Sequence, residues 1–284
     1  MLRTCSKEEF EEYIDFAYEL ALDLTKSGYP TYCDGIKTKP MFIERALKAF
    51  DREDEQTLLF ELEGEAQGLI QYFWIPEDHY LETCLFLINR ETEQALSEFL
   101  SYAGERFKGY DLFMGFPADN RAAVSFLAGH GSECIENDFN NTFFLENFEC
   151  VPENRDIVPI NKKNYELFRF LHSQIEGDMY WNCERIYDKL DGWTVFVKVK
   201  DGKPQGAAYY KDVKDGWFEI FGIDIDQDVY DAKLYKELLQ AALSDVKCRK
   251  GRVMTFFCEE EYERVAEECG FVCVGNYLCY KIHL

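Results

Sequence analysis

Apolar residues recur at every third or fourth position in some segments of the chain and at every second position in others. These are the periods of an amphipathic helix and of a strand. In the first half they predict helices at 7–25 and 39–50 and a hairpin that turns at Glu63-Gly64-Glu65. A strand, a helix, a short strand, a helix and a strand pair follow, at 80–88, 91–107, 110–116, 118–131 and 134–148.

The second half repeats this order after a polar segment at 146–156 that lacks periodicity. Two helices, at 161–175 and 180–190, precede a hairpin whose turn Asp201-Gly202-Lys203 has the glycine that tight hairpins favour. A strand, a helix, a strand, a helix and a final strand or strands follow, at 216–225, 230–246, 252–258, 259–271 and 272–284.

Each half therefore has the order α-α-β-β-β-α-β-α-β, with a weak strand possible ahead of it. Agreement of so many elements in order indicates a duplicated α/β domain. We predict one domain at 1–148 and a second at 156–284, packed side by side.

Short motifs stand at matching places in the two halves. Gly68 and Gly206 each enter the second strand of a hairpin, and "RVAEECGFVCVGNYLCYKI" combines a helix end, a Gly-Phe turn and a strand. The helix at 118–131 carries an N-x-x-A-x-x-(aromatic or Leu) run followed by glycine, at Asn120, Ala123, Phe126 and Gly131. With these motifs the whole chain resembles the tandem, two-domain members of the GNAT N-acyltransferase superfamily. The resemblance implies two GNAT-like α/β domains, each with a mixed (α+β) sheet.

The resemblance also implies acetyl-CoA, or another acyl-CoA, as co-substrate, bound where two central strands splay apart. Its pyrophosphate would rest on backbone amides at the N-terminus of the following helix, in a loop (Q/R)-x-x-G-x-(G/A) whose glycines allow close approach. In the second half Tyr230, Lys233 and Tyr235 stand at the Arg and two Gly positions. The predicted cofactor-binding residues are Ile225, Tyr230, Asp231, Ala232, Lys233, Leu234 and Tyr235.

The first-half loop departs from this pattern differently. Arg90 and Ala95 match it, but Glu93 takes the middle glycine position, where a carboxylate repels a pyrophosphate. We therefore rank the second half as the better cofactor site. Lys233 and Lys236 carry suitable charge there, although they can equally form a solvated helix face.

Catalytic groups are sparse. The family commonly uses a tyrosine in the later helix as acid toward the leaving thiolate, but Leu127 and Ala266 occupy those positions. Glu219 is the predicted catalytic base, provided that burial against neighbouring aromatic rings raises its pKa, and Glu82 is its first-half counterpart. Each glutamate can equally face solvent or pair with a lysine. The tyrosines that can act as acids, or simply pack in the core, are Tyr209, Tyr210 and Tyr277.

The amino-acid composition limits the classes of partner that the protein is expected to bind. With 31 Lys and Arg against 54 Asp and Glu, the formal charge is −23, which argues against nucleic acid and anionic membranes and favours a small-molecule amine or basic peptide. The acidity can also serve solubility alone. No apolar run reaches membrane-spanning length, and the 11 cysteines without a CxxC indicate a reduced, cytoplasmic protein. The four histidines are isolated, so we expect no metal site.

Two functions remain open. The first is an N-acetyltransferase that transfers an acyl group from acyl-CoA to a primary amine, with the second half as the catalytic one. The second is a non-catalytic GNAT-like module that binds a ligand or partner, which the missing loop glycines and tyrosine favour. Neither the acceptor, the acyl chain nor the oligomeric state follows from the sequence.

Overall fold

The computed structural model describes residues 1–177 and 179–284 and divides into two compact units. The N-terminal unit contains Met1–Asn137 together with Gly275–Leu284, and the C-terminal unit contains Asp138–Val274. This division differs from the predicted domains 1–148 and 156–284, because the last strand of each sequence half belongs partly to the unit built by the other half. The segment at 145–156 therefore lies inside the C-terminal unit.

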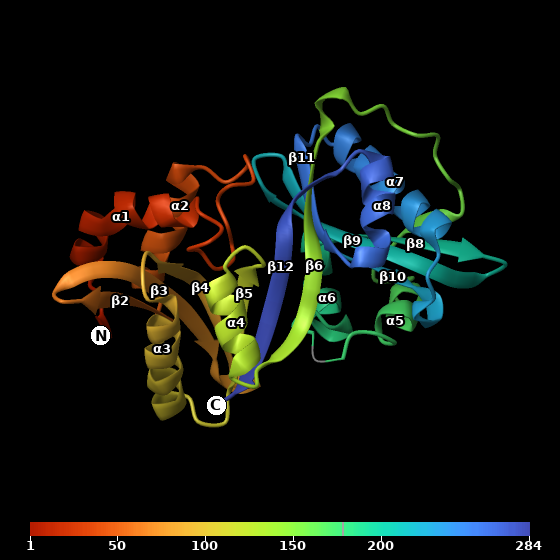
Figure 1. Ribbon diagram of the computed structural model, residues 1–284. Helices are drawn as coiled ribbons and strands as arrows, with labels where there is room; N and C mark the ends of the chain where they lie inside the picture. Colours follow the sequence, from red (N-terminus) through yellow and green to blue (C-terminus); the bar gives the residue numbers. More distant parts are fainter. Residues whose placement is uncertain (178) are drawn as a thin grey trace. The chain divides into compact units, whose positions relative to one another are not determined.

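The N-terminal unit is a mixed sheet with helices on both faces (Figure 1). Its strands run in the order β1-β2-β3-β4-β5-β12. The strands are β1 (Leu2–Thr4), β2 (Glu55–Leu62), β3 (Glu65–Ile75), β4 (Tyr80–Ile88), β5 (Asp111–Pro117) and β12 (Val272–His283). The helices are α1 (Lys7–Ala21), α2 (Lys39–Lys48), α3 (Thr92–Arg106) and α4 (Arg121–Gly129).

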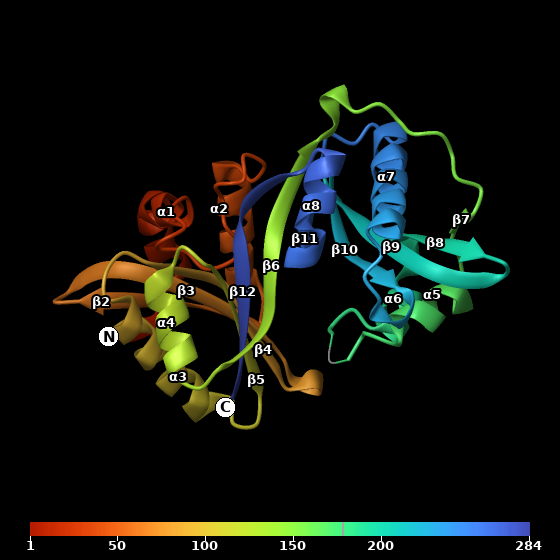
Figure 2. The same cartoon turned by 45° about the vertical axis from the view of Figure 1, so that its right-hand side comes forward.

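The C-terminal unit repeats this plan, as the turned view in Figure 2 shows. Its strands run in the order β6-β11-β10-β9-β8-β7. The strands are β6 (Glu133–Phe144), β7 (Ile157–Pro159), β8 (Thr194–Lys200), β9 (Lys203–Lys214), β10 (Trp217–Ile225) and β11 (Val253–Cys258). The helices are α5 (Glu166–His172), α6 (Cys183–Asp188), α7 (Ala232–Cys248) and α8 (Glu260–Cys269). The predicted α/β order is confirmed in both halves, including the short strands β1 and β7, whereas the predicted strand pair at 134–148 is the single strand β6.

Alternation along the strands gives each sheet two cores. In the N-terminal unit Phe60 and Tyr72 point to the core under α3 and α4, whereas Leu59, next to Phe60, and Leu85 of β4 point to the core under α1 and α2. The two faces of the C-terminal sheet differ in the same way. Tyr210 packs under α7 and α8, whereas Tyr209 packs under α5 and α6. This is the burial pattern that a period of two produces when helices cover both faces.

The two predicted hairpin turns are also confirmed. Glu63 and Gly64 have φ of 52° and 83°, and Asp201 and Gly202 have φ of 51° and 76°. Two successive positive φ values match the twist of the flanking strands, which is why glycine follows an acidic residue in both turns.

Strand pairing explains why each unit contains a segment from the other half of the sequence. Tyr277 to His283 of β12 pair antiparallel with Pro117 to Asp111 of β5, within the N-terminal unit. Phe139 to Phe144 of β6 pair antiparallel with Cys258 to Val253 of β11, within the C-terminal unit. Each sheet is thus completed by a strand from the other half of the sequence.

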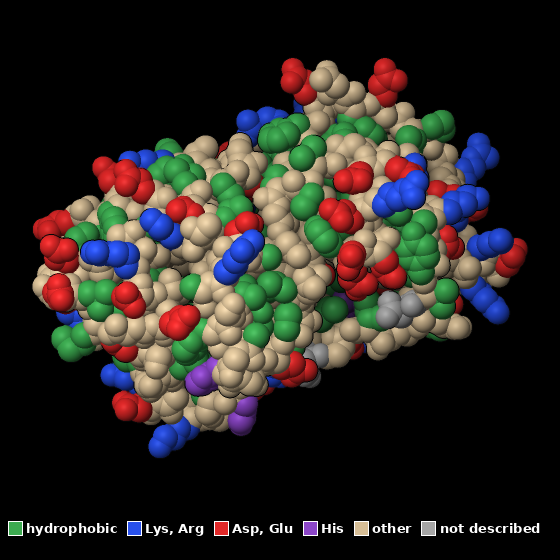
Figure 3. Space-filling model, in the orientation of Figure 1, with side chains coloured by type: hydrophobic (Ala, Val, Ile, Leu, Met, Phe, Trp, Pro, Cys, Tyr) green, Lys and Arg blue, Asp and Glu red, His purple; other side chains and the backbone are tan. Residues whose placement is uncertain are grey.

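The surface reflects the composition. On the face shown in Figure 3, acidic side chains are spread widely, with Lys and Arg between them. Among the described residues no helix is long and apolar enough to cross a membrane. None of the 11 cysteines is in a disulfide, and the described residues include no group of three or more His, Cys, Asp or Glu side chains that would hold a metal ion.

Candidate functional site

The central strands of the C-terminal unit separate partway along their length. β10 pairs in parallel with β11 only from Trp217 to Ile220, although its pairing with β9 continues to Ile225. The β9–β10 register shifts between Ile220 and Gly222, which makes Phe221 the extra residue of a bulge. We call the stretch Phe221–Ile225, beyond the last pair with β11, the C-terminal splay.

The N-terminal unit has the same irregularity. β4 pairs in parallel with β5 only from Tyr80 to Glu82, and its register with β3 shifts so that Cys84 is the bulge residue. We call Thr83–Ile88 the N-terminal splay. Glu82 and Glu219 each stand two residues before a bulge, so they occupy the same register position in their units.

The N-terminal splay is filled by the chain itself. The amide of Gly28 donates to the carbonyl of Phe86 at 2.7 Å, and the amide of Ile88 donates to the carbonyl of Lys26 at 2.9 Å. On the other side, the amide of Tyr29 donates to the carbonyl of Gly115 in β5 at 2.9 Å. The segment Lys26–Tyr29 therefore lies between the separated strands as a short extra strand, which we call the plug.

The plug is closely packed. The side-chain amide of Asn120 donates to the carbonyl of Ser27 at 3.1 Å, and Ser27 is fully buried. A β-carbon at Gly28 would lie 3.0 Å from Cβ of Phe86 and 3.1 Å from the carbonyl oxygen of Gly115. Every residue of Thr83–Ile88 is buried. No room or backbone hydrogen-bonding edge of β4 is left there for a ligand.

The C-terminal splay differs. In the described part of the chain, the pairing of β10 with β11 ends at Ile220, and no further segment makes backbone hydrogen bonds to Gly222, Ile223 or Ile225 on the side away from β9. Phe221 is 38 % exposed, and Gly222 and Ile223 are half-buried. Gly222 is required for another reason, since a β-carbon there would collide with the hydroxyl group of Tyr209. The edge of β10 is thus open in this unit and closed in the other.

The predicted cofactor loop follows this open edge. Ile225 is buried at the end of β10, and α7 begins at Ala232 with Asp231 as its N-cap. A carboxylate oxygen of Asp231 accepts a hydrogen bond from the amide of Leu234 at 2.9 Å. One of the amides predicted to face an anion is therefore occupied, and a negative charge lies at the same helix end.

The side chains of this loop have separate environments. Tyr235 is buried and stacks on Tyr262 with ring centroids 3.9 Å apart, and burial raises the pKa of Tyr235 well above its ordinary value. Tyr235 is thus a core residue beneath the loop. Tyr230 is half exposed, with its ring 5.1 Å from that of Tyr262. Lys233 is exposed, whereas Lys236 pairs with Glu268 at 3.0 Å.

The corresponding helix end in the N-terminal unit, the start of α3, has no side-chain cap, in contrast to the start of α7. Glu91 precedes α3 in the left-handed conformation and caps no amide with its side chain, and Glu93 is exposed. Arg90 donates to the buried side chain of Gln67 at 3.2 Å. This helix end is uncapped but lies beside a filled splay, whereas the α7 end is capped but lies beside an open one.

Glu219 lies just before the open edge and is half-buried. It is paired across the sheet with Lys211 of β9 and with Thr255 of β11. The Thr255 hydroxyl accepts a hydrogen bond from the indole N–H of Trp217 at 2.9 Å. The carboxylate is therefore held among neighbours that include a cation.

Lys211 itself lies in a box of aromatic rings that the sequence did not indicate. Its Nζ is 3.6 Å from the ring centroid of Trp181, 3.9 Å from that of Trp193 and 5.3 Å from that of Phe221. We call these three rings the aromatic box. Burial and the charge of Lys189 lower the pKa of Lys211 to about 8, although Glu219 opposes the shift. The rings come from three distant segments, so no local motif could reveal the box.

A buried polar network supports the box. His172 and Asp224 are both buried and lie 2.9 Å apart (Nδ1 to Oδ2), and Nε2 of His172 is 2.8 Å from the carbonyl oxygen of Trp181. Tyr209 also forms a side-chain hydrogen bond with Asp224. In the sequence His172 is isolated, and the only local signal of its partner is an aspartate within the otherwise apolar end of β10.

The other candidate acids are occupied or buried. Besides its bond to Asp224, burial holds the pKa of Tyr209 well above its ordinary value. Tyr210 donates to Oδ2 of Asp245 at 2.6 Å, and burial raises its pKa too. In the N-terminal unit, burial raises the pKa of Tyr277. Leu127 and Ala266, at the family's tyrosine positions, are fully buried.

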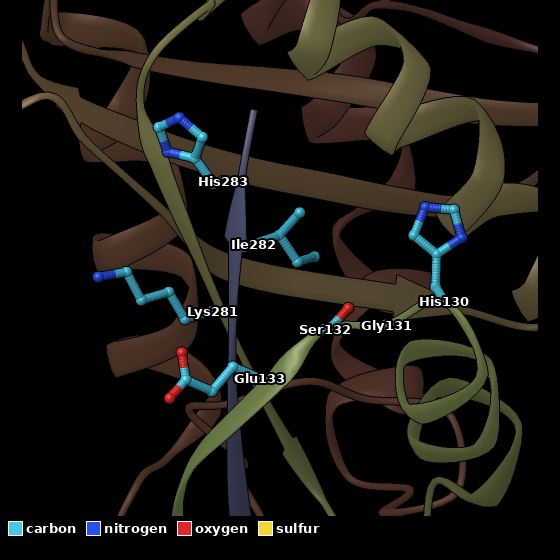
Figure 4. A pocket seen from close by; sticks show the side chains of 7 residues that line it. All are labelled: His130, Gly131, Ser132, Glu133, Lys281, Ile282 and His283. Carbon is cyan, nitrogen blue, oxygen red and sulfur yellow. The ribbon is translucent and has the colours of Figure 1, made fainter.

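A hollow at the end of β12 is a poor alternative. Figure 4 shows its lining side chains, among them His130, Lys281 and His283. Lys281 and His283 both lie 2.9 Å from the carboxylate of Asp111 at the start of β5. Since β4 and β5 are parallel, this hollow lies at the opposite end of β5 from the splay.

Comparison with known proteins identifies the fold. No family model and no curated protein matches the sequence. Among solved structures, a GCN5-related N-acetyltransferase from Sphaerobacter thermophilus has a TM-score of 0.68 at 13 % identity, covering 99 % of this chain and 95 % of its own. A tandem GNAT protein from the clavulanic acid biosynthesis pathway has a TM-score of 0.55 at 9 % identity, covering 99 % and 98 %.

A third similar structure is the glucosamine N-acetyltransferase region of a fungal multi-domain GH3 β-N-acetylglucosaminidase. It has a TM-score of 0.64 at 10 % identity and covers 99 % of this chain but 38 % of that one. Identities this low carry the fold and not the activity. The chain has the fold of the GNAT N-acetyltransferases and shares it, over almost its whole length, with a tandem GNAT protein.

Proposed function

We propose that the protein is an acyl-CoA-dependent N-acetyltransferase that acts on a primary amine, with the C-terminal unit as its catalytic half. The observation that carries this proposal is the contrast between the two splays. The plug fills the strand edge of the N-terminal unit, whereas no inserted segment of the described chain lies beside the edge of β10 after Ile220, and Glu219 stands just before that edge.

The open edge suits an extended thioester chain. A strand edge without a neighbouring strand binds an extended ligand as a further strand would, and here Phe221 is exposed and Gly222 and Ile223 are half-buried. Acetyl-CoA would supply the activated acyl group. A backbone N–H of the splayed stretch would stabilise the negative charge that develops on the carbonyl oxygen.

Glu219 would act on the acceptor. An ammonium cannot attack a carbonyl, so one proton must leave the nitrogen before or during attack. The carboxylate of Glu219 would accept that proton, and the neutral amine would then form a C–N bond while the C–S bond breaks. The nitrogen loses its second proton to solvent as the C–S bond breaks, and the departing thiolate takes up a proton from solvent, because Tyr209 and Tyr210 are held by Asp224 and Asp245.

Phosphate binding would be weak and sensitive to salt. The amides of Ala232 and Lys233 and the exposed Lys233 side chain offer positive charge at the start of α7, but the carboxylate of Asp231 opposes an anion. The formal net charge of −23 favours a cationic acceptor, either a small amine or a basic peptide.

A specific observation favours the second candidate, a non-catalytic module. Neither unit combines an open splay with an uncapped helix end, because Asp231 caps α7 and the plug closes the splay beside α3. In that case the chain would bind its partner without turning over acyl-CoA.

One experiment separates the two candidates. Thermal unfolding is measured with and without CoA, and thiol release from acetyl-CoA is followed with a panel of primary amines. Saturating ligand at a hundred times its dissociation constant stabilises the protein by about 2.7 kcal/mol. We expect stabilisation by CoA and turnover that Glu219→Gln lowers roughly 10- to 1,000-fold.

Glu82→Gln is the matched control, since Glu82 has the same register position beside the filled splay. It should leave turnover unchanged. Turnover that falls with Glu82→Gln and not with Glu219→Gln would assign catalysis to the other unit, and neither binding nor turnover would favour the non-catalytic module.

A further inference from the structure

The side chain of Lys211 lies among aromatic rings, which is unusual for a lysine on a β-strand. Its ammonium lies within 4 Å of the ring centroids of Trp181 and Trp193, and Phe221 closes a third side at 5.3 Å. In the described residues, Lys211 makes no ion pair or hydrogen bond of its own. Tryptophan faces attract a cation, so the box fixes the position of Nζ without neutralising it.

This position is next to the proposed acyl site. Phe221, which forms one side of the box, is the bulge residue at which β10 leaves β11. Glu219, the proposed base, is the residue directly opposite Lys211 in the β9–β10 pairing. An amine, a carboxylate and an open strand edge therefore meet at one point of the sheet.

The chemical state of the amine suits nucleophilic attack. Because the pKa of Lys211 is lowered to about 8, a much larger share of its amine is neutral near pH 7.5 than for a lysine of ordinary pKa. The charged form loses solvation in the half-buried box, and the charge of Lys189 disfavours it further.

We propose that Lys211 is an acyl acceptor within the protein, modified on Nζ by an acyl-CoA bound at the C-terminal splay. The inference rests on the proposed function. Neutral Nζ attacks the thioester carbonyl carbon, the C–N bond forms as the C–S bond breaks, and CoA leaves as its thiolate. The proton lost by nitrogen passes to Glu219 and then to solvent. The product is an amide without charge.

Acylation changes the box. The amide has no cation for the tryptophan faces to attract, so the modified side chain would leave the rings. The emptied box would then be open to the cationic group of an acceptor that approaches Glu219. Before modification the Lys211 ammonium would occupy the aromatic box, and after modification the box would be free to bind the cationic group of an acceptor.

The test is site-resolved mass spectrometry of the full chain incubated with acetyl-CoA at pH 7.5. We expect Lys211 to gain an acetyl group at least tenfold faster than Lys189, which also faces Trp181, at 5.2 Å, but for which no box is built. Excess CoA should slow the reaction at Lys211 alone. Lys211→Arg keeps a cation in the box and should abolish this mark, whereas Lys189→Arg should leave it unchanged.

Labelling with a second acyl donor, N-hydroxysuccinimide acetate, distinguishes failure of this inference from failure of the proposed function. If it labels Lys211 first but acetyl-CoA does not, the lysine is reactive without an acyl-CoA site and the proposal is overturned. If CoA stabilises the protein and amines are acetylated while Lys211 stays unmodified, the proposed function stands and this inference falls. If CoA neither binds nor slows any labelling, both fall.

Discussion

Nδ1 of His172 lies 2.9 Å from Oδ2 of Asp224, and both side chains are buried. Because Nε2 faces the carbonyl oxygen of Trp181, which only accepts hydrogen bonds, it carries a proton, and when Nδ1 is protonated as well the pair is an imidazolium facing a carboxylate. Burial acts to lower the pKa of His172, but the bonds to Asp224 and Trp181 prevail and raise it above its ordinary value. The pair joins α5, β10 and one wall of the aromatic box.

Replacing His172 should therefore be costly. His172→Ala leaves the buried carboxylate of Asp224 with its bond to Tyr209 but without a cationic partner, and removing one member of a buried ion pair typically destabilises a protein by about 3–5 kcal/mol. Urea unfolding at pH 6 measures the loss, with the exposed His130→Ala as the control. Equal stability of the two variants would show that the pair contributes little.

The same pair predicts a dependence on pH. The folded-state pKa of His172 lies above the unfolded value, so the stabilisation is fully present below pH of about 6.5 and is lost as pH rises through the folded-state pKa. Wild type should lose more stability than His172→Ala between pH 6 and 9. Parallel curves for the two proteins would contradict this.

The lowered pKa of Lys211 leads us to expect the opposite pH dependence of folding stability at higher pH. Its folded-state pKa of about 8 lies below the ordinary lysine value of 10.5, so between these values the unfolded state holds a proton that the folded state has lost. Stability therefore rises with pH in this window. In Lys211→Met that contribution should be absent, as urea midpoints at pH 7.5, 9 and 10 would show. A variant with an unchanged slope would place the lysine in ordinary solvent.

The plug predicts a steric effect at Gly28. An added methyl group would lie 3.0–3.1 Å from Phe86 and from the backbone of Gly115, so Gly28→Ala should destabilise the fold by about 1–3 kcal/mol. Gly104→Ala in α3 is the control, because a β-carbon there meets nothing within 4 Å. It should be neutral or stabilising by up to about 1 kcal/mol. If Gly28→Ala behaves like the control, the plug is not tightly packed.

Asp231 predicts a gain of affinity. Asp231→Asn keeps a side-chain oxygen for the amide of Leu234 and removes the charge at the start of α7. Calorimetry should find CoA bound roughly 3- to 10-fold more tightly, with little change in thermal stability. Glu93→Gln, at the corresponding helix end beside the plug, should leave CoA affinity as it is. Unchanged affinity in Asp231→Asn would move the phosphate site away from α7.

Local patterns in the sequence determined most of the fold. Hairpin turns at Glu63-Gly64 and Asp201-Gly202, the helices and the repeated order of elements follow from periods and turn residues that span a few positions. The matching places of Glu82 and Glu219 could be predicted for the same reason, since each follows from counting along one strand.

Only the tertiary structure decided which side chains meet. Lys211 and Trp181, His172 and Asp224, and Gly28 and Phe86 are separated by 30 to 58 positions, and β5 pairs on one side with β12, the last strand of the chain. Such contacts depend on how sheets close and which strand edge stays unpaired, and periodicity carries no information on either. The sequence thus placed a carboxylate at each splay, and long-range packing closed one splay and left the other open.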